Sequence, residues 1–137
     1  MYLSDRQGLP LALSNPIAGN HTDLYAIDES SEELFSTLEK AEIRTDGIFI
    51  NADSGFDSKE FRSICKKWGV IPNVAFNYRN GENKDEYLLD DLLYKQRYAI
   101  ERTNAWLDSF RSLLNRLDYT VSNWKSFNYI AFMIILF

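Results

Sequence analysis

The stretch Ile48-Phe49-Ile50-Asn51-Ala52-Asp53-Ser54-Gly55 places a short apolar run directly before an acidic turn. The apolar run after Gly47 predicts a β-strand of a few residues. A carboxylate at the carboxyl end of such a strand projects beyond the edge of the sheet, where open α/β folds bind their ligands. Asp53 is therefore a candidate site residue, and Gly55 lets the chain turn sharply behind it. An ordinary Asx turn after the strand is the alternative interpretation.

A helix is expected on each side of this strand. Ser30 and Glu33 have the spacing of a capping box, which predicts the start of the first helix. Asp57 or Ser58 is expected to cap the second helix, and Gly69 is expected to end it. The residues expected on the buried stripes are Leu34, Leu38 and Ala41 in the first helix and Phe61, Ile64 and Trp68 in the second.

The remaining segments complete an alternating order of strands and helices. A hairpin is expected at the start, where the turn Asp5-Arg6-Gln7-Gly8 joins two short strands. The expected elements are strands over Met1 to Ser4, Leu9 to Ser14 and Val70 to Ala75, loops over residues 15–23 and 76–86, a long helix from about Asp91 to Arg116 and a last helix from about Asn123 to Phe137. This order indicates an α/β fold, with a mixed sheet because the chain begins with a hairpin.

The composition is that of one globular domain. With 137 residues, of which 45% are hydrophobic, the chain can bury a core. The single cysteine, Cys65, excludes an internal disulfide and fits a reducing compartment. The start MYLSDRQG has neither the basic nor the apolar region of a secretory signal. The apolar tail from Tyr129 to Phe137 is about half the roughly 20 residues of a membrane span. We therefore expect a buried helix end in a cytoplasmic protein without membrane contact.

The charge of the chain is unevenly distributed. A net charge of −5 argues, taken alone, against a nucleic-acid partner. Residues 1–50 carry nine acids and three bases, however, whereas residues 92–116 carry five bases and two acids. The basic stretch is compatible with contacts to phosphate groups, and a solvated helix face is the alternative.

The expected long helix carries an unusual stripe. Tyr94, Arg97 and Glu101 are spaced i, i+3 and i+7, so they share one face of the helix. This stripe combines an aromatic ring, a cation and a carboxylate. Such a combination is not typical of a helix face buried in a core or of one exposed only to solvent. It suits a helix that presents a carboxylate to a site while the arginine holds a phosphate. A surface Arg–Glu pair is the alternative.

Five blocks of the chain share their spacing with one known family. They are residues 51–58 (NADSGFDS), the Y-x2-R-x3-E set Tyr94, Arg97 and Glu101, the run 102–113 (RTNAWLDSFRSL), the G-x-P-L block Gly8 to Ala12 and the GN-x2-D block Gly19 to Asp23. In this order they resemble the DDE-type transposases of bacterial insertion sequences. The resemblance covers nearly the whole chain, so residues 1–137 are identified as part of a transposase DDE catalytic domain.

The resemblance implies an RNase H-like fold and a chemistry. A triad of Asp, Asp and Glu would bind two divalent ions, Mg²⁺ or Mn²⁺. One ion would activate water or a 3′-hydroxyl, and the other would stabilise the leaving oxygen of an in-line displacement. Asp53 would be the second aspartate and Glu101 the glutamate, both catalytic and both metal ligands. The residues implied to contact the DNA of transposon ends are Tyr94, Lys95, Arg97, Arg102 and Arg111.

The sequence departs from the family pattern at its start. The first catalytic aspartate of the family lies on the central strand before the hairpin, and no such strand is present here. Asp5 sits at the turn instead, and Asp108 stands where the family often has lysine. We therefore expect a fragment that is inactive alone and marginally folded, with an exposed sheet edge. Its expected partners are an upstream transposase fragment or further copies of itself, at the bacterial nucleoid.

Other functions remain open on the sequence. A non-catalytic DNA-binding or oligomerisation remnant would modulate a full-length transposase without needing the two acids. A small RNase H-type nuclease would need a third acidic ligand, for which Asp23, Asp57 and Asp5 are the nearby candidates. A serine or cysteine hydrolase is disfavoured because His21, the single histidine, accompanies no recognisable nucleophile motif.

Overall fold

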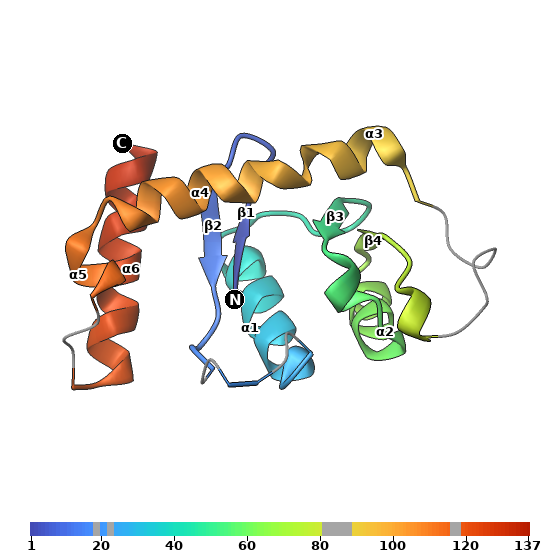
Figure 1. Ribbon diagram of the computed structural model, residues 1–137, viewed down its shortest axis with the longest axis horizontal. Helices are drawn as coiled ribbons and strands as arrows, with labels where there is room; N and C mark the ends of the chain where they lie inside the picture. Colours follow the sequence, from blue (N-terminus) through green and yellow to red (C-terminus); the bar gives the residue numbers. More distant parts are fainter. Residues whose placement is uncertain (18–19, 22–23, 81–88, 116–118) are drawn as a thin grey trace.

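The computed structural model describes residues 1–17, 20–21, 24–80, 89–115 and 119–137 (Figure 1). The strands are β1 (Tyr2–Ser4), β2 (Pro10–Leu13), β3 (Phe49–Ala52) and β4 (Ile71–Val74). The α-helices are α1 (Ile27–Lys40), α2 (Lys59–Lys67), α3 (Asp91–Tyr94), α4 (Ala99–Asp108), α5 (Arg111–Leu114) and α6 (Val121–Leu136). Short 3-10 turns are η1 (Ser54–Phe56), η2 (Tyr78–Asn80) and η3 (Lys95–Tyr98). This mixture and order of elements agrees with the expected α/β class.

The described strands form two pairs rather than the single mixed sheet that the sequence predicted. β1 and β2 pair in antiparallel fashion, whereas β3 and β4 pair in parallel. Among the described residues no ladder of hydrogen bonds joins β1 to β3. In the part of the chain that the structure describes, each strand bonds to one other strand, so the outer edges of β1 and β3 carry no strand partner.

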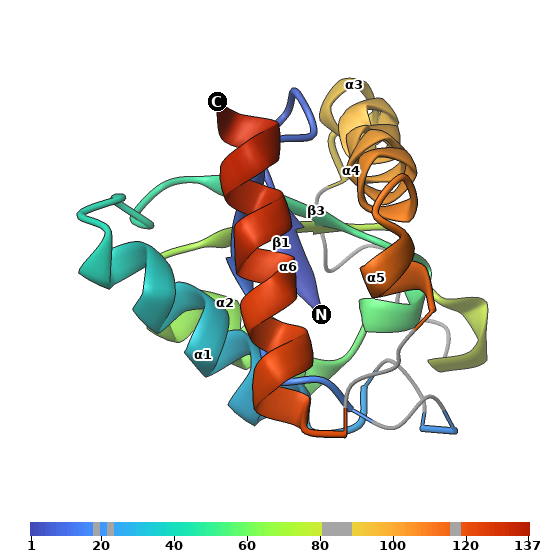
Figure 2. The same cartoon turned by 90° about the vertical axis from the view of Figure 1, so that its left-hand side faces the viewer.

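Helices cover both sides of the two strand pairs. α3, η3 and α4 follow one another as a rod that passes along both pairs, while α1 and α2 lie on the opposite side (Figure 1). α6 stands beside β2 at one end of the molecule (Figures 1 and 2). The rod therefore connects the hairpin at its α4 end with the parallel pair at its α3 end.

Two apolar clusters hold these layers together. The larger one joins α1, α2 and β4, and its buried members are Ala12, Ile27, Leu34, Phe35, Leu38, Phe61, Ile64, Cys65, Val70 and Val74. The smaller one joins β2, α4 and α6 through Leu13, Leu107, Ala131 and Phe132. Since Ala12 and Leu13 belong to different clusters, the alternating side chains of β2 contribute to both.

The first expected turn is confirmed in the hairpin. The Asp5 carboxylate accepts hydrogen bonds from the backbone N–H groups of Gln7 and Leu9, each at 2.8 Å. Gly8 has φ +86°, a left-handed conformation that side chains disfavour. The predicted second helix is likewise capped by Ser58, whose Oγ accepts from the Phe61 N–H at 3.1 Å.

The predicted capping box of the first helix is wrong. α1 begins at Ile27, after Ala26 in a left-handed conformation, and Ser30 is buried inside the helix. Burial of Ile27 lengthens the helix by a turn, since tertiary packing overrides a local cap signal. Leu34 and Leu38 are buried as expected, but Ala41 is exposed beyond the last helical residue.

The expected long helix is broken, and the apolar tail is only half buried. A 3-10 turn interrupts the rod at residues 95–98, α4 ends at Asp108, and Phe110 adopts an extended conformation before α5. On α6, Ala131 and Phe132 are buried, while Ile130, Met133, Ile134 and Leu136 are exposed. Because one stripe of a surface helix is enough to contact a core, the expected burial of the helix end holds for this stripe and is wrong for the rest of the tail. None of the described helices has the length and apolarity needed to cross a membrane.

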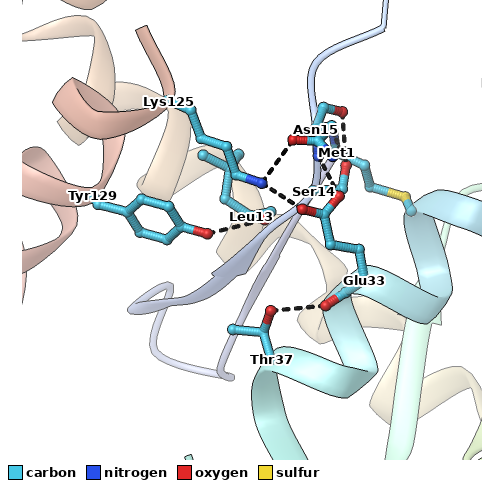
Figure 3. A network of polar contacts seen from close by, with 8 residues as sticks. All are labelled: Met1, Leu13, Ser14, Asn15, Glu33, Thr37, Lys125 and Tyr129. Carbon is cyan, nitrogen blue, oxygen red and sulfur yellow. Dashed lines mark hydrogen bonds and ion pairs between the residues drawn. The ribbon is translucent and has the colours of Figure 1, made fainter. Parts of the chain in front are cut away.

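A polar network fastens α6 to β2 and α1 (Figure 3). The Lys125 ammonium donates to the Asn15 side-chain oxygen at 2.9 Å and to the Glu33 carboxylate. The same carboxylate accepts the backbone N–H of Asn15 at 2.6 Å. Burial tends to raise the pKa of Glu33, but the hydrogen bonds from Lys125 and Asn15 and the charge of Lys125 together lower it. The network therefore favours an ionised Glu33 in the folded chain.

Phe35→Ala tests the larger cluster. The Phe35 side chain is 1% exposed, so its truncation should lower the free energy of unfolding by about 3–5 kcal/mol. Phe49→Ala is the matched control, because the Phe49 side chain is 52% exposed and its loss should cost less than about 1 kcal/mol. Denaturant unfolding measures both changes. Equal losses for the two variants would contradict this position of the core.

The Glu33 network predicts a contribution to acid unfolding. The folded pKa of Glu33 lies below its unfolded value of 4.5, so the unfolded chain gains a proton first as the pH falls. The stabilisation is thus fully present above about pH 5 and is lost as the pH drops through the folded pKa. Glu33→Gln should flatten the dependence of unfolding free energy on pH in this window. The exposed Glu39→Gln on α1 serves as the control, and a profile of Glu33→Gln as steep as that of the control would contradict the assignment.

Candidate functional site

Asp53 lies directly after β3, at the entrance of η1. Its backbone carbonyl accepts the N–H of Phe56 at 2.9 Å, which closes the sharp turn expected at Gly55. The carboxylate makes no capping hydrogen bond to this turn. The side chain is 58% exposed and is directed to another part of the chain. An Asx turn therefore does not account for Asp53.

The partner of Asp53 is Arg97 on η3. The Arg97 Nη1 lies 2.9 Å from the Asp53 Oδ1, which is the distance of a charge-assisted hydrogen bond. The Arg97 guanidinium also lies over the ring of Tyr94, 5.6 Å from its centroid, within reach of a cation–π interaction. The two places that the sequence singled out, the end of β3 and the stripe on the helix, are thus in direct contact.

A pair of asparagines, Asn73 buried and Asn51 half-buried, explains why the helix lies against β3. Asn51 and Asn73 are opposite one another in the parallel ladder, and the Asn73 amide donates to the Asn51 side-chain oxygen at 2.7 Å. Asn73 also accepts the backbone N–H of Asp90 at 2.9 Å and donates to the Asp90 carbonyl at 3.1 Å. Asn51 donates to the carbonyl of Leu93 at 3.0 Å. The two amides therefore bind the start of α3 through its backbone.

Asp90 then sets the direction of the helix. Its carboxylate accepts the N–H groups of Leu92 and Leu93 at 2.9 and 3.0 Å, so it is the N-cap of α3. With its first turn fixed at β4, the rod passes β3 so that Arg97 reaches Asp53. Sequence reasoning missed Asn51, Asn73 and Asp90. The pairing of the two asparagines depends on the register of β3 with β4, so no local sequence pattern signals it.

Glu101 is an exposed residue in the first turn of α4, one turn beyond Arg97. The charge of Glu101 affects the pKa of Tyr2 on β1. Burial raises the pKa of Tyr2 to about 12, and the negative charges of Asp108 and Glu101 add to this effect. Glu101 is therefore within electrostatic reach of β1, while its helical neighbour Arg97 contacts the end of β3.

The hairpin anchors α4 at this position. Thr103, which is fully buried, donates its hydroxyl to the Gly8 carbonyl at 2.5 Å, and Arg102 donates to the Gln7 carbonyl at 2.8 Å. A Cβ atom at Gly8 would lie 2.7 Å from the Ala99 carbonyl oxygen, so only glycine permits this approach. The other expected DNA contacts, Lys95 on η3 and Arg111 at the start of α5, are exposed.

The comparison with protein families gives one result. The family model described as the transposase DDE domain matches residues 3–136. The chain belongs to this family. Comparisons with curated proteins and with solved structures give no match.

Asp53 and Glu101 of this transposase domain have the oxygen ligands that a divalent ion prefers. Two such side chains are too few to complete a metal site. Carboxylate oxygens are the ligands that Mg²⁺ prefers. In the part of the chain that the structure describes, however, no three side chains of His, Cys, Asp or Glu come together as a metal site would need. Asp53 is moreover paired with Arg97. The described residues therefore do not make a complete metal site by themselves.

The candidates for a third ligand have other roles. Asp57 is buried, where its carboxylate binds Arg62 at 2.7 Å and accepts the Asn77 N–H at 2.8 Å. The Asp5 carboxylate holds the hairpin turn. Asp23 lies outside the described residues. Asp57 and Asp5 are therefore not free to bind a metal ion, which argues against the interpretation as a small nuclease.

The hydrolase interpretation gains no support from the transposase domain. His21 stacks on Tyr25 with a centroid distance of 3.7 Å. Burial raises the pKa of the Cys65 thiol to about 12, so the thiol is protonated at neutral pH and is a poor nucleophile.

Asn73→Leu tests the positioning of the helix. The substitution keeps a similar volume but leaves the backbone N–H and carbonyl of Asp90 and the side-chain oxygen of Asn51 without their partner. We expect a loss of about 1–3 kcal/mol in unfolding free energy and faster hydrogen exchange at the amides of α3. Asn115→Leu, at an exposed position, is the matched control. Unchanged exchange in α3 of the Asn73 variant would show that the amide pair does not hold the helix.

Proposed function

We propose that the chain is part of a catalytic domain that cleaves and transfers DNA strands at the ends of an insertion sequence. The observation that supports this proposal is the contact between Arg97 and Asp53. It brings together the two signature segments of a transposase DDE domain, the turn after β3 and the Y-x2-R-x3-E helix. A protein with this activity would work at the bacterial nucleoid.

Each residue has a separate role in the proposal. Asp53 and Glu101 supply two of the three carboxylates that hold Mg²⁺ or Mn²⁺, and both are catalytic residues. Arg97 and Tyr94 support the Asp53 carboxylate and contact DNA. Lys95, Arg102 and Arg111 bind phosphate oxygens of the backbone without reading the sequence.

We also propose that the third carboxylate comes from outside the described residues, on a strand that completes an RNase H-like sheet. Two observations support this addition. The outer edges of β1 and β3 carry no described strand partner, and Glu101 is within electrostatic reach of Tyr2 on β1 while Arg97 contacts the end of β3. Unpaired edges of this kind accept a further strand through backbone hydrogen bonds. The source of that strand is an upstream transposase fragment or a second copy.

A cleavage assay tests the proposed activity. The chain is incubated with terminal-repeat DNA and Mg²⁺ or Mn²⁺, alone and with the protein segment encoded directly upstream of Met1. We expect no cleavage by the chain alone and cleavage by the mixture. Asp53→Asn or Glu101→Gln should abolish cleavage by the mixture, because each removes a charged ligand.

The controls of this assay are exposed acids on α1. Asp28→Asn and Glu39→Gln change the same charges away from the site and should leave cleavage unaltered. Cleavage that survives both Asp53→Asn and Glu101→Gln would refute their catalytic role. Robust cleavage by the chain alone would refute the expected dependence on a further segment.

A second candidate function is a non-catalytic, DNA-binding or oligomerising remnant that modulates a full-length transposase. It is favoured by the lack of a three-ligand cluster in residues 1–17, 20–21, 24–80, 89–115 and 119–137. Such a protein would bind DNA equally well with and without Mg²⁺, with an affinity that falls with salt. It would tolerate Asp53→Asn and Glu101→Gln, whereas the loss of Arg97, Arg102 or Arg111 would weaken binding.

A further inference from the structure

A hollow lies between the hairpin turn and the helical rod. It has a volume of about 350 Å³ and is lined by Arg6, Gln7, Gln96, Tyr98 and Arg102. The turn lies beside the rod in both views of the molecule (Figures 1 and 2). The hollow therefore borders the helical residues that follow Arg97.

The hairpin backbone on one side of the hollow is held in place before any ligand arrives. The turn is fixed from inside by the Asp5 carboxylate, which accepts two backbone N–H groups. It is fixed from outside by Arg102 and Thr103, which donate to the carbonyls of Gln7 and Gly8. A backbone fixed in advance lowers the entropic cost of binding, so this side of the hollow is suited to a specific ligand.

Two guanidinium groups give the hollow a positive charge. Neither Arg6 nor Arg102 belongs to any of the ion pairs of the described residues, whereas Arg97 is paired with Asp53. The nearest acid in sequence to Arg6 is Asp5, whose carboxylate is already bonded to the turn, and Glu101 precedes Arg102 on α4. In a chain of net charge −5, this pair of arginines is suited to an anion, above all to phosphate.

An aromatic ring and two amides accompany the arginines. Tyr98 is 64% exposed, and its ring takes part in none of the ring pairs of the described residues. An exposed ring beside arginines is the arrangement on which unpaired bases stack in proteins that bind single strands. The amides of Gln7 and Gln96 carry donors and acceptors for the edge of such a base.

We propose that this hollow binds one unpaired nucleotide of DNA, with its phosphate at Arg6 and Arg102 and its base against Tyr98. The volume agrees with one nucleotide, since it lies near the lower limit of roughly 300–1,000 Å³ for small-ligand sites. A duplex is far too wide to enter. The inference rests on the proposed function, because it gives that DNA a second contact along the rod that carries Glu101.

Binding of a labelled single-stranded oligonucleotide, followed by fluorescence anisotropy, tests the inference on the full chain. Arg6→Gln and Tyr98→Ala should each weaken binding about tenfold, while Tyr98→Phe retains it. Arg6→Gln should also reduce the dependence of log affinity on log salt concentration by about 0.7. Arg44→Gln is the control, since it removes an exposed arginine from the loop after α1. Unchanged thermal unfolding of each variant confirms that it folds.

An abasic oligonucleotide separates the two parts of the ligand. It should bind wild type about as weakly as the intact oligonucleotide binds Tyr98→Ala, and Tyr98→Ala should not weaken its binding further. Equal affinity of wild type for the abasic and intact strands would overturn the proposed base contact.

The remaining outcomes separate this inference from the proposed function. If DNA binding is unaffected by Arg6→Gln and Tyr98→Ala but lost in Arg97→Ala, the hollow is not a nucleotide site and the proposed function stands. If the wild-type chain binds neither single-stranded nor duplex DNA, both fail.

Discussion

The buried amide of Asn73 is the contact on which the geometry of the site depends. The side chain is 2% exposed and bonds to Asn51 on the neighbouring strand and to both backbone groups of Asp90. Leaving such buried groups without partners costs about 1–3 kcal/mol. The ion pair between Arg97 and Asp53 is partly exposed to solvent, and exposed pairs contribute roughly 0–1 kcal/mol. The asparagine pair therefore holds α3 against β3 and β4. The ion pair between Arg97 and Asp53 forms as a consequence of this position.

The α4 end of the rod is fixed by close packing of its backbone against the hairpin at Gly8. Gly8 lets the hairpin backbone approach α4 so closely that Thr103 can bond to its carbonyl. Lys125 and Glu33 then bind α6 and α1 to the chain after β2 (Figure 3). Because the rod is attached to both strand pairs (Figure 1), the first turn of α4 brings Glu101 within electrostatic reach of Tyr2 on β1. This position follows from packing at two distant points, not from any property of Glu101.

Local chemistry explains what the sequence could predict. The hairpin turn at Asp5 and Gly8, the Ser58 cap and the end of α2 at Gly69 each depend on a few neighbouring residues, and all three are confirmed. The contact between the Asp53 turn and the Tyr94 to Glu101 stripe was suggested by family resemblance. The roles of Asp53 and Glu101 in metal binding stay predictions.

Long-range packing explains what the sequence could not predict. The stretch from Asp91 to Arg116 contains no proline or glycine, yet the helix is interrupted where η3 meets β3 and again where Phe110 turns toward the smaller cluster. Ser30 has the character of a cap but is buried in α1. The asparagine pair depends on the register of β3 with β4, which no local pattern encodes.

The central claim is that Asp53 and Glu101 lie close enough to share one cation. Broadening of backbone amide signals by dilute Mn²⁺ in a nuclear magnetic resonance spectrum measures this most directly. The account predicts that residues 52–54 and 100–102 broaden together, and that Asp53→Asn or Glu101→Gln relieves both groups. Broadening of one group alone, or broadening that persists in both variants, would contradict it.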